Sequence, residues 1–446
     1  MIKVCKFGGT SMADGNMMKR VAAIVKSDDS RRYVVVSAPG KRFGGDVKIT
    51  DLLYACYESV KETGVCGEAF TKIADRFRGI VAELGLKMAI DDILDDTRRE
   101  IERERSADFT ASRGEYLAAR VMAALLGFEF IDARDVVKFR PDGQLDSELT
   151  FDLTAQALKG KKYAVVSGFY GEGHDGRIKT FSRGGSDISG AIVARAAMAD
   201  LYENWTDVSG FLACDPRIVE NPVGIRAMSY KELRELSYMG ANVLHSESIF
   251  PVRAANIPIQ IKNTFRPTDE GTMILPISKY RYSGRIVTGI AGKKNFTVIF
   301  IEKSLMNAEI GFARKVLSAM EKHGVSFEHM PSGIDTMSFV IDSEVLKHGV
   351  LEKLLEDIRK AVNPDNLRVF DDVALIATVG HGMSKNVGTS AKLFDAIARA
   401  GINVRMIDQG SSELNIIVGV DNDNCERAIR AIYEEFFKKE GTSFGL

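Results

Sequence analysis

Short, continuous runs of apolar residues recur through the first part of the chain, and they constrain its fold more than any other feature. Residues 33–36 read Tyr-Val-Val-Val and residues 163–166 read Tyr-Ala-Val-Val. A run of this length is typical of a strand that is buried on both faces. Helical patterns separate the runs, and this alternation predicts an α/β fold with a mostly parallel sheet. We expect strands at residues 2–7, 33–37, 128–132, 163–167, 201–205 and 257–261.

The last third of the chain contains an internal repeat with a constant offset of 77 residues. A methionine and three glycines keep the same register, since Met306, Gly311, Gly324 and Gly333 match Met383, Gly388, Gly401 and Gly410. Each copy reads strand, helix, strand, strand and a second helix, with the second helices expected at residues 344–362 and 425–438. The repeat predicts two ferredoxin-like β-α-β-β-α-β units.

A polar, basic stretch at residues 278–285 separates the two regions of the chain. We therefore expect one larger domain over residues 1–280. The two repeat units are expected to follow it, at residues 290–365 and 371–446.

The composition excludes several classes of protein. The 446 residues carry 60 Lys and Arg against 61 Asp and Glu, so the chain has no general attraction to nucleic acid or to an acidic membrane surface. The five cysteines form no C-x-x-C pair, and the six histidines are scattered. No apolar run reaches the roughly 18 residues of a membrane helix, and residues 1–11 have no secretory-signal pattern. We expect a cytoplasmic protein with reduced thiols, no nucleic-acid or membrane partner and no metal-ligand cluster.

The first candidate site is a glycine-rich turn at residues 6–11, Lys-Phe-Gly-Gly-Thr-Ser. A predicted strand ends there and a helical pattern begins. Gly8 and Gly9 let the backbone approach a ligand closely, and free N–H groups at such a turn suit a phosphate. Lys6 adds a point charge. By itself the segment fits a tight turn equally well, and it lacks the G-x-x-x-x-G-K-[ST] pattern of a P-loop.

A second glycine-rich turn, residues 182–187 (Ser-Arg-Gly-Gly-Ser-Asp), also lies between a predicted strand and a helix. Arg183 can hold a carboxylate or a phosphate through two hydrogen bonds. Asp187 lies at the expected start of the helix, where a capping role is the alternative. Two such turns in one sheet favour a pair of loops that together hold a polyphosphate.

Other polar residues lie where the expected strands and helices begin or end, which is where open α/β sheets bind ligands. Residues 206–217, from Thr-Asp to Asp-Pro-Arg, fit either a nucleotide loop or a turn-rich hairpin. Ser37 ends a strand, Thr50 opens a helix, and residues 112–115 are expected to open another. For each of these groups alone, helix capping is the alternative.

These motifs, in this order, resemble those of the monofunctional aspartate kinases. The resemblance, which includes the repeat, extends over almost the whole chain. The residues that carry the resemblance are 6–11, 183–187 and 206–217. The resemblance implies a three-layer amino acid kinase domain followed by two ACT domains. It also implies transfer of the γ-phosphoryl group of Mg-ATP to the side-chain carboxylate of L-aspartate. That reaction is the first step toward lysine, threonine and methionine.

The resemblance also implies roles for individual residues, in three groups. The catalytic pair would be Lys6 and Asp187. The nucleotide would be bound by Lys6, Gly8, Gly9, Thr206, Asp207, Leu212, Arg217 and Asn242. The aspartate would be bound by Ser37, Thr50, Glu115, Phe169, Arg183 and Ser186, with Arg183 on the α-carboxylate and Glu115 on the ammonium group.

The chemistry agrees with these roles. A carboxylate acceptor with a pKa near ~4 is ionised at neutral pH, so the reaction needs no general base. Alignment and neutralisation of the phosphoryl charge must then supply catalysis. Two positions depart from the family pattern, since Asn242 and Leu212 stand where the family often has Lys and Tyr. We interpret both as variation within the family.

ACT domains resemble amino-acid sensors that bind an effector at a helix N-terminus. In the first copy this region contains Met306, Gly311, Phe312 and Ala313, and the acidic or polar residues near its second and third strands are Glu328, Ser332 and Asp335. Acidic groups suit the ammonium group of lysine, so we expect feedback inhibition by lysine. Pairing of ACT domains across chains implies a homodimer or a dimer of dimers.

Two other functions stay open. One is another enzyme of the same fold, with glutamate or a nucleotide monophosphate as the acceptor. The other is a catalytically weak chain that senses an amino acid through its repeat.

Overall fold

The computed structural model describes residues 1–182, 184–241, 244, 248–281 and 284–438, and the chain divides into two compact units. The first unit contains Met1–Phe211, Gly224–Leu233 and Asn242–Tyr280. The second contains Leu212–Val223, Arg234–Ala241 and Arg281–Leu446. Two short segments before residue 242 thus group with the C-terminal part of the chain. The domain boundaries given above stay predictions.

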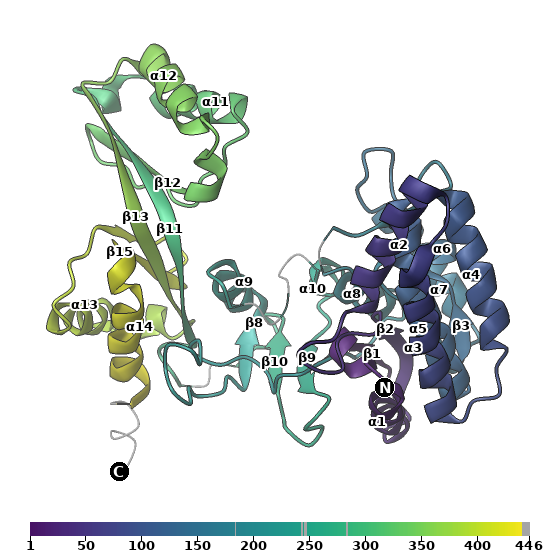
Figure 1. Ribbon diagram of the computed structural model, residues 1–446. Helices are drawn as coiled ribbons and strands as arrows, with labels where there is room; N and C mark the ends of the chain where they lie inside the picture. The colour runs from purple at the N-terminus through teal and green to yellow at the C-terminus, as the bar shows by residue number, and fades with distance from the viewer. Residues whose placement is uncertain (183, 242–243, 245–247, 282–283, 439–446) are drawn as a thin grey trace, which may run out of the picture. The chain divides into compact units, whose positions relative to one another are not determined.

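An eight-stranded sheet forms the centre of the first unit (Figure 1). Its strands follow the order β3 (Glu129–Ile131), β4 (Ala164–Ser167), β2 (Arg31–Val36), β1 (Lys3–Phe7), β7 (Leu201–Thr206), β9 (Ile259–Asn263), β10 (Thr272–Leu275) and β8 (Ala227–Ser229). All neighbours pair in parallel except β9 and β10. The mostly parallel sheet predicted from the apolar runs is therefore confirmed. A small hairpin of β5 (Tyr170–Glu172) and β6 (Ile178–Thr180) lies outside it.

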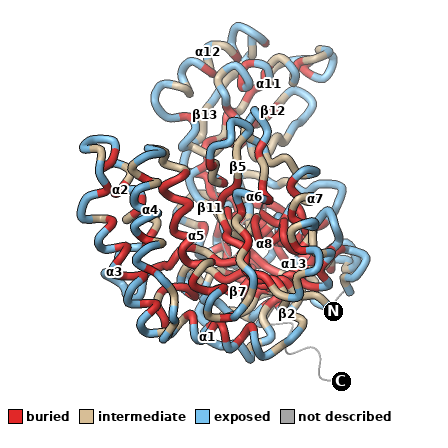
Figure 2. The backbone as a smooth tube through the Cα atoms, turned by 90° about the vertical axis from the view of Figure 1, so that its right-hand side faces the viewer, coloured by how far each residue is buried: buried red, intermediate tan, exposed pale blue. Residues whose placement is uncertain are grey.

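Helices cover the sheet in two groups. The first group consists of α1 (Gly15–Lys26), α2 (Ile49–Thr63), α3 (Gly67–Leu84), α4 (Ile90–Glu104) and α5 (Ala107–Leu126), which pack on one another. The second consists of α6 (Ala133–Val136), α7 (Ser147–Leu158), α8 (Gly185–Ala196) and α10 (Phe250–Ala254). Both groups contact strands of the sheet, which therefore lies between two helical layers. Figure 2 shows that α5 and α8 are the largely buried members.

One predicted helix start is wrong. Residues 112–115 lie inside α5, which begins at Ala107. Ser106 is its cap, because the Ser106 hydroxyl accepts a hydrogen bond from the Phe109 N–H at 3.3 Å. Ser112 donates to the Phe109 carbonyl at 2.6 Å, as a hydroxyl inside a helix does.

The second unit contains a five-stranded antiparallel sheet in the order β12 (Thr336–Asp342), β11 (Gly289–Glu302), β13 (Asn366–Val379), β15 (Asn415–Asp421) and β14 (Met406–Asp408). Its helices are α11 (Phe312–Lys322), α12 (Val350–Val362), α13 (Thr389–Arg399) and α14 (Cys425–Tyr433), and α9 (Tyr230–Tyr238) spans the division between the units. The two long strands, β11 and β13, pair with each other along both repeats. The ferredoxin-like part of the predicted fold class is confirmed.

The backbone conformation before the first helix of each copy explains why glycine recurs there. Gly311 precedes α11 with φ 80°, and its counterpart Gly388 precedes α13 with φ 87°. Only glycine adopts this left-handed conformation without a steric cost. The periodic glycines therefore mark the same turn in both copies. Among the described residues, no helix combines the length and the apolar character that crossing a membrane requires.

Close packing of α8 on β7 predicts a stability effect. A Cβ atom at Gly190 would lie 2.5 Å from the Tyr202 hydroxyl oxygen. Gly190→Ala should therefore cost about 1–3 kcal/mol and lower the melting temperature. Gly79→Ala is the matched control, because Gly79 also lies inside a helix and has open space around it. Equal melting temperatures for the two variants would contradict this packing.

Candidate active site

The first glycine turn follows the carboxyl end of β1 in the middle of the sheet. Lys6 lies beside Val35 of β2 and Asn204 of β7. The Gly8 N–H donates to the Trp205 carbonyl at 3.1 Å, which attaches the turn to β7. A Cβ atom at Gly9 would lie 3.0 Å from the Ala38 carbonyl oxygen, so the turn also packs closely against the loop that follows β2.

The second glycine turn meets the first one through an ion pair. The Lys6 ammonium lies 2.6 Å from Asp187 Oδ1, and both side chains are largely buried. Asn204 donates to the same carboxylate oxygen at 2.9 Å, and the Tyr202 hydroxyl donates to the Asp187 backbone carbonyl at 3.1 Å. Segments about 180 residues apart in the sequence thus form one charged centre.

The predicted acceptor residues converge next to this centre. The Ser37 hydroxyl donates to the Ser186 hydroxyl at 2.8 Å, which joins the end of β2 to the start of α8. Phe169 has a positive φ of 78°, and its N–H donates to the Ser189 hydroxyl at 3.0 Å. A Cβ atom at Gly185 would lie 2.5 Å from the Phe169 ring, so only glycine allows this approach.

Glu115 is buried on α5, and one of its carboxylate oxygens has no hydrogen-bond partner. Burial raises the pKa of Glu115 to about 8, although the N–H of Ala38 and the charge of Lys6 lower it. A buried carboxylate with an unused oxygen is suited to an incoming ammonium group.

The remaining predicted site residues are less closely grouped. Thr50 lies half-buried in the first turn of α2. The Thr206 hydroxyl donates to Asp207 Oδ1 at 3.2 Å at the end of β7. Leu212 and Arg217 belong to the second unit, where Arg217 is exposed and pairs with Asp215 at 2.6 Å. Arg183 and Asn242 lie outside the described residues.

Most of the predicted effector residues lie around the start of α11 in the second unit, whereas Glu328 pairs with Val340 toward the far end of β12. Met306 and Phe312 are buried there, Gly311 caps α11, and Ala313 is half-buried. One carboxylate oxygen of Glu328 is buried without a hydrogen-bond partner, and burial raises the pKa of Glu328. Asp335 Oδ1 accepts a hydrogen bond from the Leu305 N–H at 2.9 Å, so this side chain holds the turn before Met306. Ser332 is exposed and forms a β-bridge with Met337.

Reasoning from the sequence missed Asn204, Tyr202 and Ala38. Asn204 had a signal, because a polar amide at an interior position of a buried strand needs a partner. Tyr202 lies two residues earlier and therefore shares its face of the sheet. Ala38 had no signal, since it contributes its backbone N–H to Glu115.

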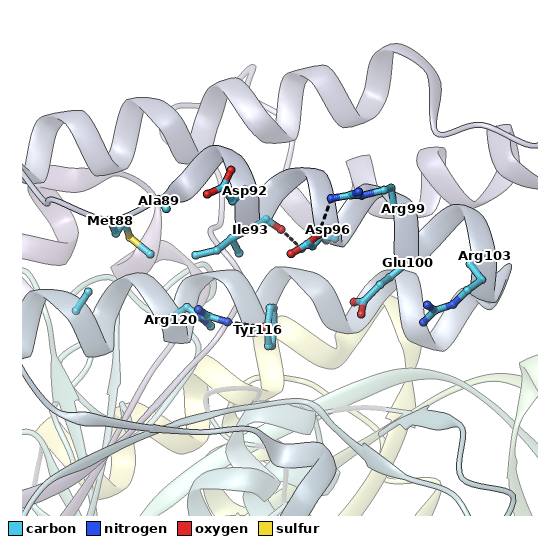
Figure 3. A pocket seen from close by; sticks show the side chains of 12 residues that line it. Met88, Ala89, Asp92, Ile93, Asp96, Arg99, Glu100, Arg103, Tyr116 and Arg120 are labelled. Carbon is cyan, nitrogen blue, oxygen red and sulfur yellow. Dashed lines mark hydrogen bonds and ion pairs between the residues drawn. The ribbon is translucent and has the colours of Figure 1, made fainter.

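A separate pocket lies between α4 and α5 (Figure 3). Charged residues of α4 line one side, and Tyr116 and Arg120 of α5 line the other. Asp96 pairs with Arg99 at 2.7 Å, and Arg120 donates to the Tyr116 hydroxyl at 2.7 Å. None of the predicted site residues lines this pocket.

The chain is similar in sequence to known proteins. The model of the amino acid kinase family matches residues 1–263, and an ACT domain model matches residues 376–436. Aspartokinase 3 of Bacillus subtilis (strain 168) is 38% identical over 450 residues, which is 98% of this chain and 99% of that protein.

The chain is also similar to solved structures. The aspartate kinase of Clostridium acetobutylicum is 51% identical, with a TM-score of 0.91, over 98% of this chain and all of that one. Escherichia coli aspartokinase III is 26% identical over 98% of this chain. Its complex with aspartate and ADP gives a TM-score of 0.78 over 100% of that chain, and its complex with lysine and aspartate gives 0.74 over 99%.

The fold and the charged centre between the two glycine turns define an enzyme of the amino acid kinase class, which transfers a phosphoryl group from ATP to a carboxyl group. Within that class, this chain belongs to the aspartokinase family. The family resemblance predicted from the three motifs is confirmed.

The raised pKa of Glu115 predicts a pH-dependent stability difference. Native Glu115 keeps its proton up to about pH 8, whereas the unfolded residue releases it near the ordinary value of 4.5. The contribution of Glu115 to stability is therefore complete below pH 4.5 and is lost as the pH rises toward 8. Glutamine at position 115 cannot ionise. The melting temperature of Glu115→Gln should therefore rise relative to that of the wild type as the pH increases from 5 to 8.

The matched control is Glu62→Gln, which changes an exposed residue of α2. Its melting temperature should stay parallel to that of the wild type across the same pH range. A pH-independent difference for Glu115→Gln would show that Glu115 is ionised in the folded protein.

Proposed function

We propose that this chain transfers the γ-phosphoryl group of Mg-ATP to the side-chain carboxylate of L-aspartate and so produces 4-phospho-L-aspartate. This product would open the route to lysine, threonine and methionine. The observation that carries the proposal is the ion pair of Lys6 and Asp187, because it joins a turn suited to phosphate to the residues suited to an amino acid. The complex of E. coli aspartokinase III with aspartate and ADP supports the same substrates.

Lys6 would stabilise the charge on the transferring phosphoryl group. Its ammonium is fixed by Asp187 before the nucleotide binds, so little reorganisation is needed during the reaction. Asn204 donates to the same Asp187 carboxylate oxygen that pairs with Lys6. The Gly8 N–H is already bonded to the Trp205 carbonyl, so the turn would bring the backbone N–H of Gly9 to the phosphates.

Magnesium would neutralise phosphate charge when it binds together with the nucleotide. Asp187 fits this ion, because a carboxylate oxygen is a ligand that Mg²⁺ prefers and this carboxylate lies beside Lys6 at the phosphate turn. The described residues contain no group of three or more His, Cys, Asp or Glu side chains that could hold a metal ion. The nucleotide phosphates and water would therefore supply most of the magnesium ligands.

The acceptor would be oriented by both of its charged ends. Glu115 would bind the ammonium group, and Arg183 would bind the α-carboxylate. The side-chain carboxylate would then face the phosphoryl group near Ser37, Thr50, Phe169 and Ser186. Since the pKa of Glu115 is about 8 in the free protein, binding of an ammonium group at pH 7 would release a proton.

The test of the acceptor is a coupled assay of ADP release with Mg-ATP and one amino acid at a time. We expect turnover with L-aspartate and a kcat/KM for L-glutamate at least about a hundredfold lower, because the extra methylene displaces the carboxylate from the phosphoryl group. Omission of Mg²⁺ should abolish turnover. Turnover with glutamate alone would reject the proposed acceptor.

The second unit would regulate the enzyme by binding lysine, and its ACT domains would pair across a homodimer or a dimer of dimers in the cytoplasm. The support for lysine is the buried carboxylate oxygen of Glu328, which has no hydrogen-bond partner and lies on the segment that pairs with Val340 of β12. The complex of E. coli aspartokinase III with lysine and aspartate supports the same effector.

Glu328→Gln should weaken inhibition, because the amide cannot pair with the ammonium group of lysine. We expect the half-inhibitory concentration of lysine to rise about tenfold, which corresponds to about 1.4 kcal/mol. The kcat without lysine should stay near that of the wild type. Glu321→Gln, on the exposed face of α11, is the matched control and should leave inhibition unchanged. Equal inhibition of both variants would move the effector site away from Glu328.

A further inference from the structure

Arg76 lies on the apolar face of α3, where a charged residue is unexpected. Its neighbours on this face, Ile73, Phe77 and Ile80, are all buried. The Arg76 side chain is only 4% exposed, and its Nε atom has no hydrogen-bond partner. Burial of a guanidinium group is costly unless its other donors are satisfied. Arg76 must therefore gain its stabilisation from its two terminal nitrogens.

These two nitrogens bind two different loops of the first unit. Nη2 donates to the carbonyl of Ala13 at 3.0 Å and to the carbonyl of Gly40. Nη1 donates to Asp46 Oδ2 at 2.9 Å and to the carbonyl of Val47 at 3.2 Å. Ala13 lies beyond the glycine turn that follows β1, and the other three residues lie in the loop that follows β2.

The loop over residues 37–48 has no helix or strand of its own, so its shape depends on contacts of this kind. Its start carries Ser37, and Thr50 is the second residue of α2, which follows its end. Gly40 donates its N–H to the Gly9 carbonyl at 2.8 Å. A Cβ atom at Gly40 would lie 2.8 Å from the carbonyl carbon of Gly9. The loop therefore packs directly on the turn proposed to bind phosphate.

Asp46 closes this loop on itself. Arg42 donates to the Asp46 carboxylate from Nε at 2.8 Å, from Nη2 at 2.9 Å and from its backbone N–H at 2.9 Å. These hydrogen bonds from Arg42 hold the pKa of Asp46 well below its ordinary range. The Asp46 carboxylate is therefore ionised at neutral pH, and it joins the closed loop to Arg76.

We infer that Arg76 is a positioning residue, which sets the distance between the phosphate-side turn at Gly8 and Gly9 and the acceptor-side loop at residues 37–48. One planar guanidinium holds both segments against the rigid helix α3. Phosphoryl transfer requires the two reacting groups to be aligned, and a displacement of about 1 Å can cost a hundredfold in rate. The inference rests on the proposed function only for the identity of the acceptor.

The experiment compares Arg76→Lys, Arg76→Met and Asp46→Asn with the control Arg78→Met. Arg78 lies on the exposed face of the same helix and pairs only with Asp75 and Asp91 among the residues described. Lysine keeps the charge of Arg76, but its single ammonium cannot reach both loops as the planar fork does. Steady-state kinetics, melting temperature and the ADP affinity by calorimetry are measured for each variant.

For Arg76→Lys and Asp46→Asn, we expect kcat to fall about tenfold to a hundredfold and the KM of the acceptor to rise. The KM of ATP and the affinity for ADP should change less than about threefold, because Gly8 is held independently by the Trp205 carbonyl. Loss of folded protein alone would lower the apparent kcat and leave both KM values unchanged. Arg78→Met should behave like the wild type.

Two results would overturn the inference. One is a folded Arg76→Lys enzyme whose kcat and acceptor KM lie within twofold of the wild type. The other is an equal rise in the KM of ATP and of the acceptor. If Arg76→Met fails to fold, Arg76→Lys and Asp46→Asn still decide the question. Turnover of aspartate by the wild type tests the proposed function separately, and the variants are compared with whichever acceptor the wild type uses.

Discussion

The ion pair of Lys6 and Asp187 joins the two glycine turns of the first unit, and the rest of the active site is arranged around it. It requires β1 and β7 to be parallel neighbours, so that both chains end at the same edge of the sheet. It also requires α8 to approach β7 closely, which the absence of a side chain at Gly190 permits. The two charges are largely removed from water, so each would be costly to bury alone. The pair, together with Asn204, keeps a positive charge at the centre of the site in the absence of any ligand.

Much of the fold could be predicted from the sequence. The apolar runs gave the strands of the first unit, because a strand buried on both faces has no alternation to obscure it. The two glycine motifs could be identified for a similar reason, since close approach of backbones excludes larger side chains. The repeat followed from Gly311 and Gly388, whose positive φ leaves glycine little alternative.

Other features could not be predicted, because they depend on tertiary contacts. The start of α5 was misplaced, since Ser106 and Ser112 are both acceptable caps and only the fold decides between them. Asn204 was missed because its partner, Asp187, comes from a different element. The spacing of Ile73 and Ile80 puts Arg76 on the apolar face of α3, but its partners could not be predicted because they come from loops outside this helix. The pairing of β11 with β13 along both repeats could not be predicted either, because each repeat taken alone predicts a separate unit.

Two buried groups of the first unit show how stability and function oppose each other. Glu115 has an unused carboxylate oxygen, and Arg76 has an unused Nε. Each would be replaced by an apolar residue if stability were the only requirement. The two differ in what offsets their cost: Arg76 finds its partners inside the folded chain, whereas in the proposed function Glu115 finds its partner only when an amino acid binds. The unpaired carboxylate oxygen of Glu115 would therefore lower the stability of the free protein, and it would favour substrates whose ammonium group can pair with it.

The second unit is stabilised by one sheet that both of its repeats share. Its core lies between one continuous sheet and the helices, and β11 and β13 each contribute residues to both repeats. A shift of either long strand would therefore change the pairing in both repeats at once, because a one-residue slip moves every side chain to the opposite face. An effector that binds at the start of α11 would act on a sheet that both repeats share. The two repeats are therefore one structural body built on a shared sheet, and not two independent domains.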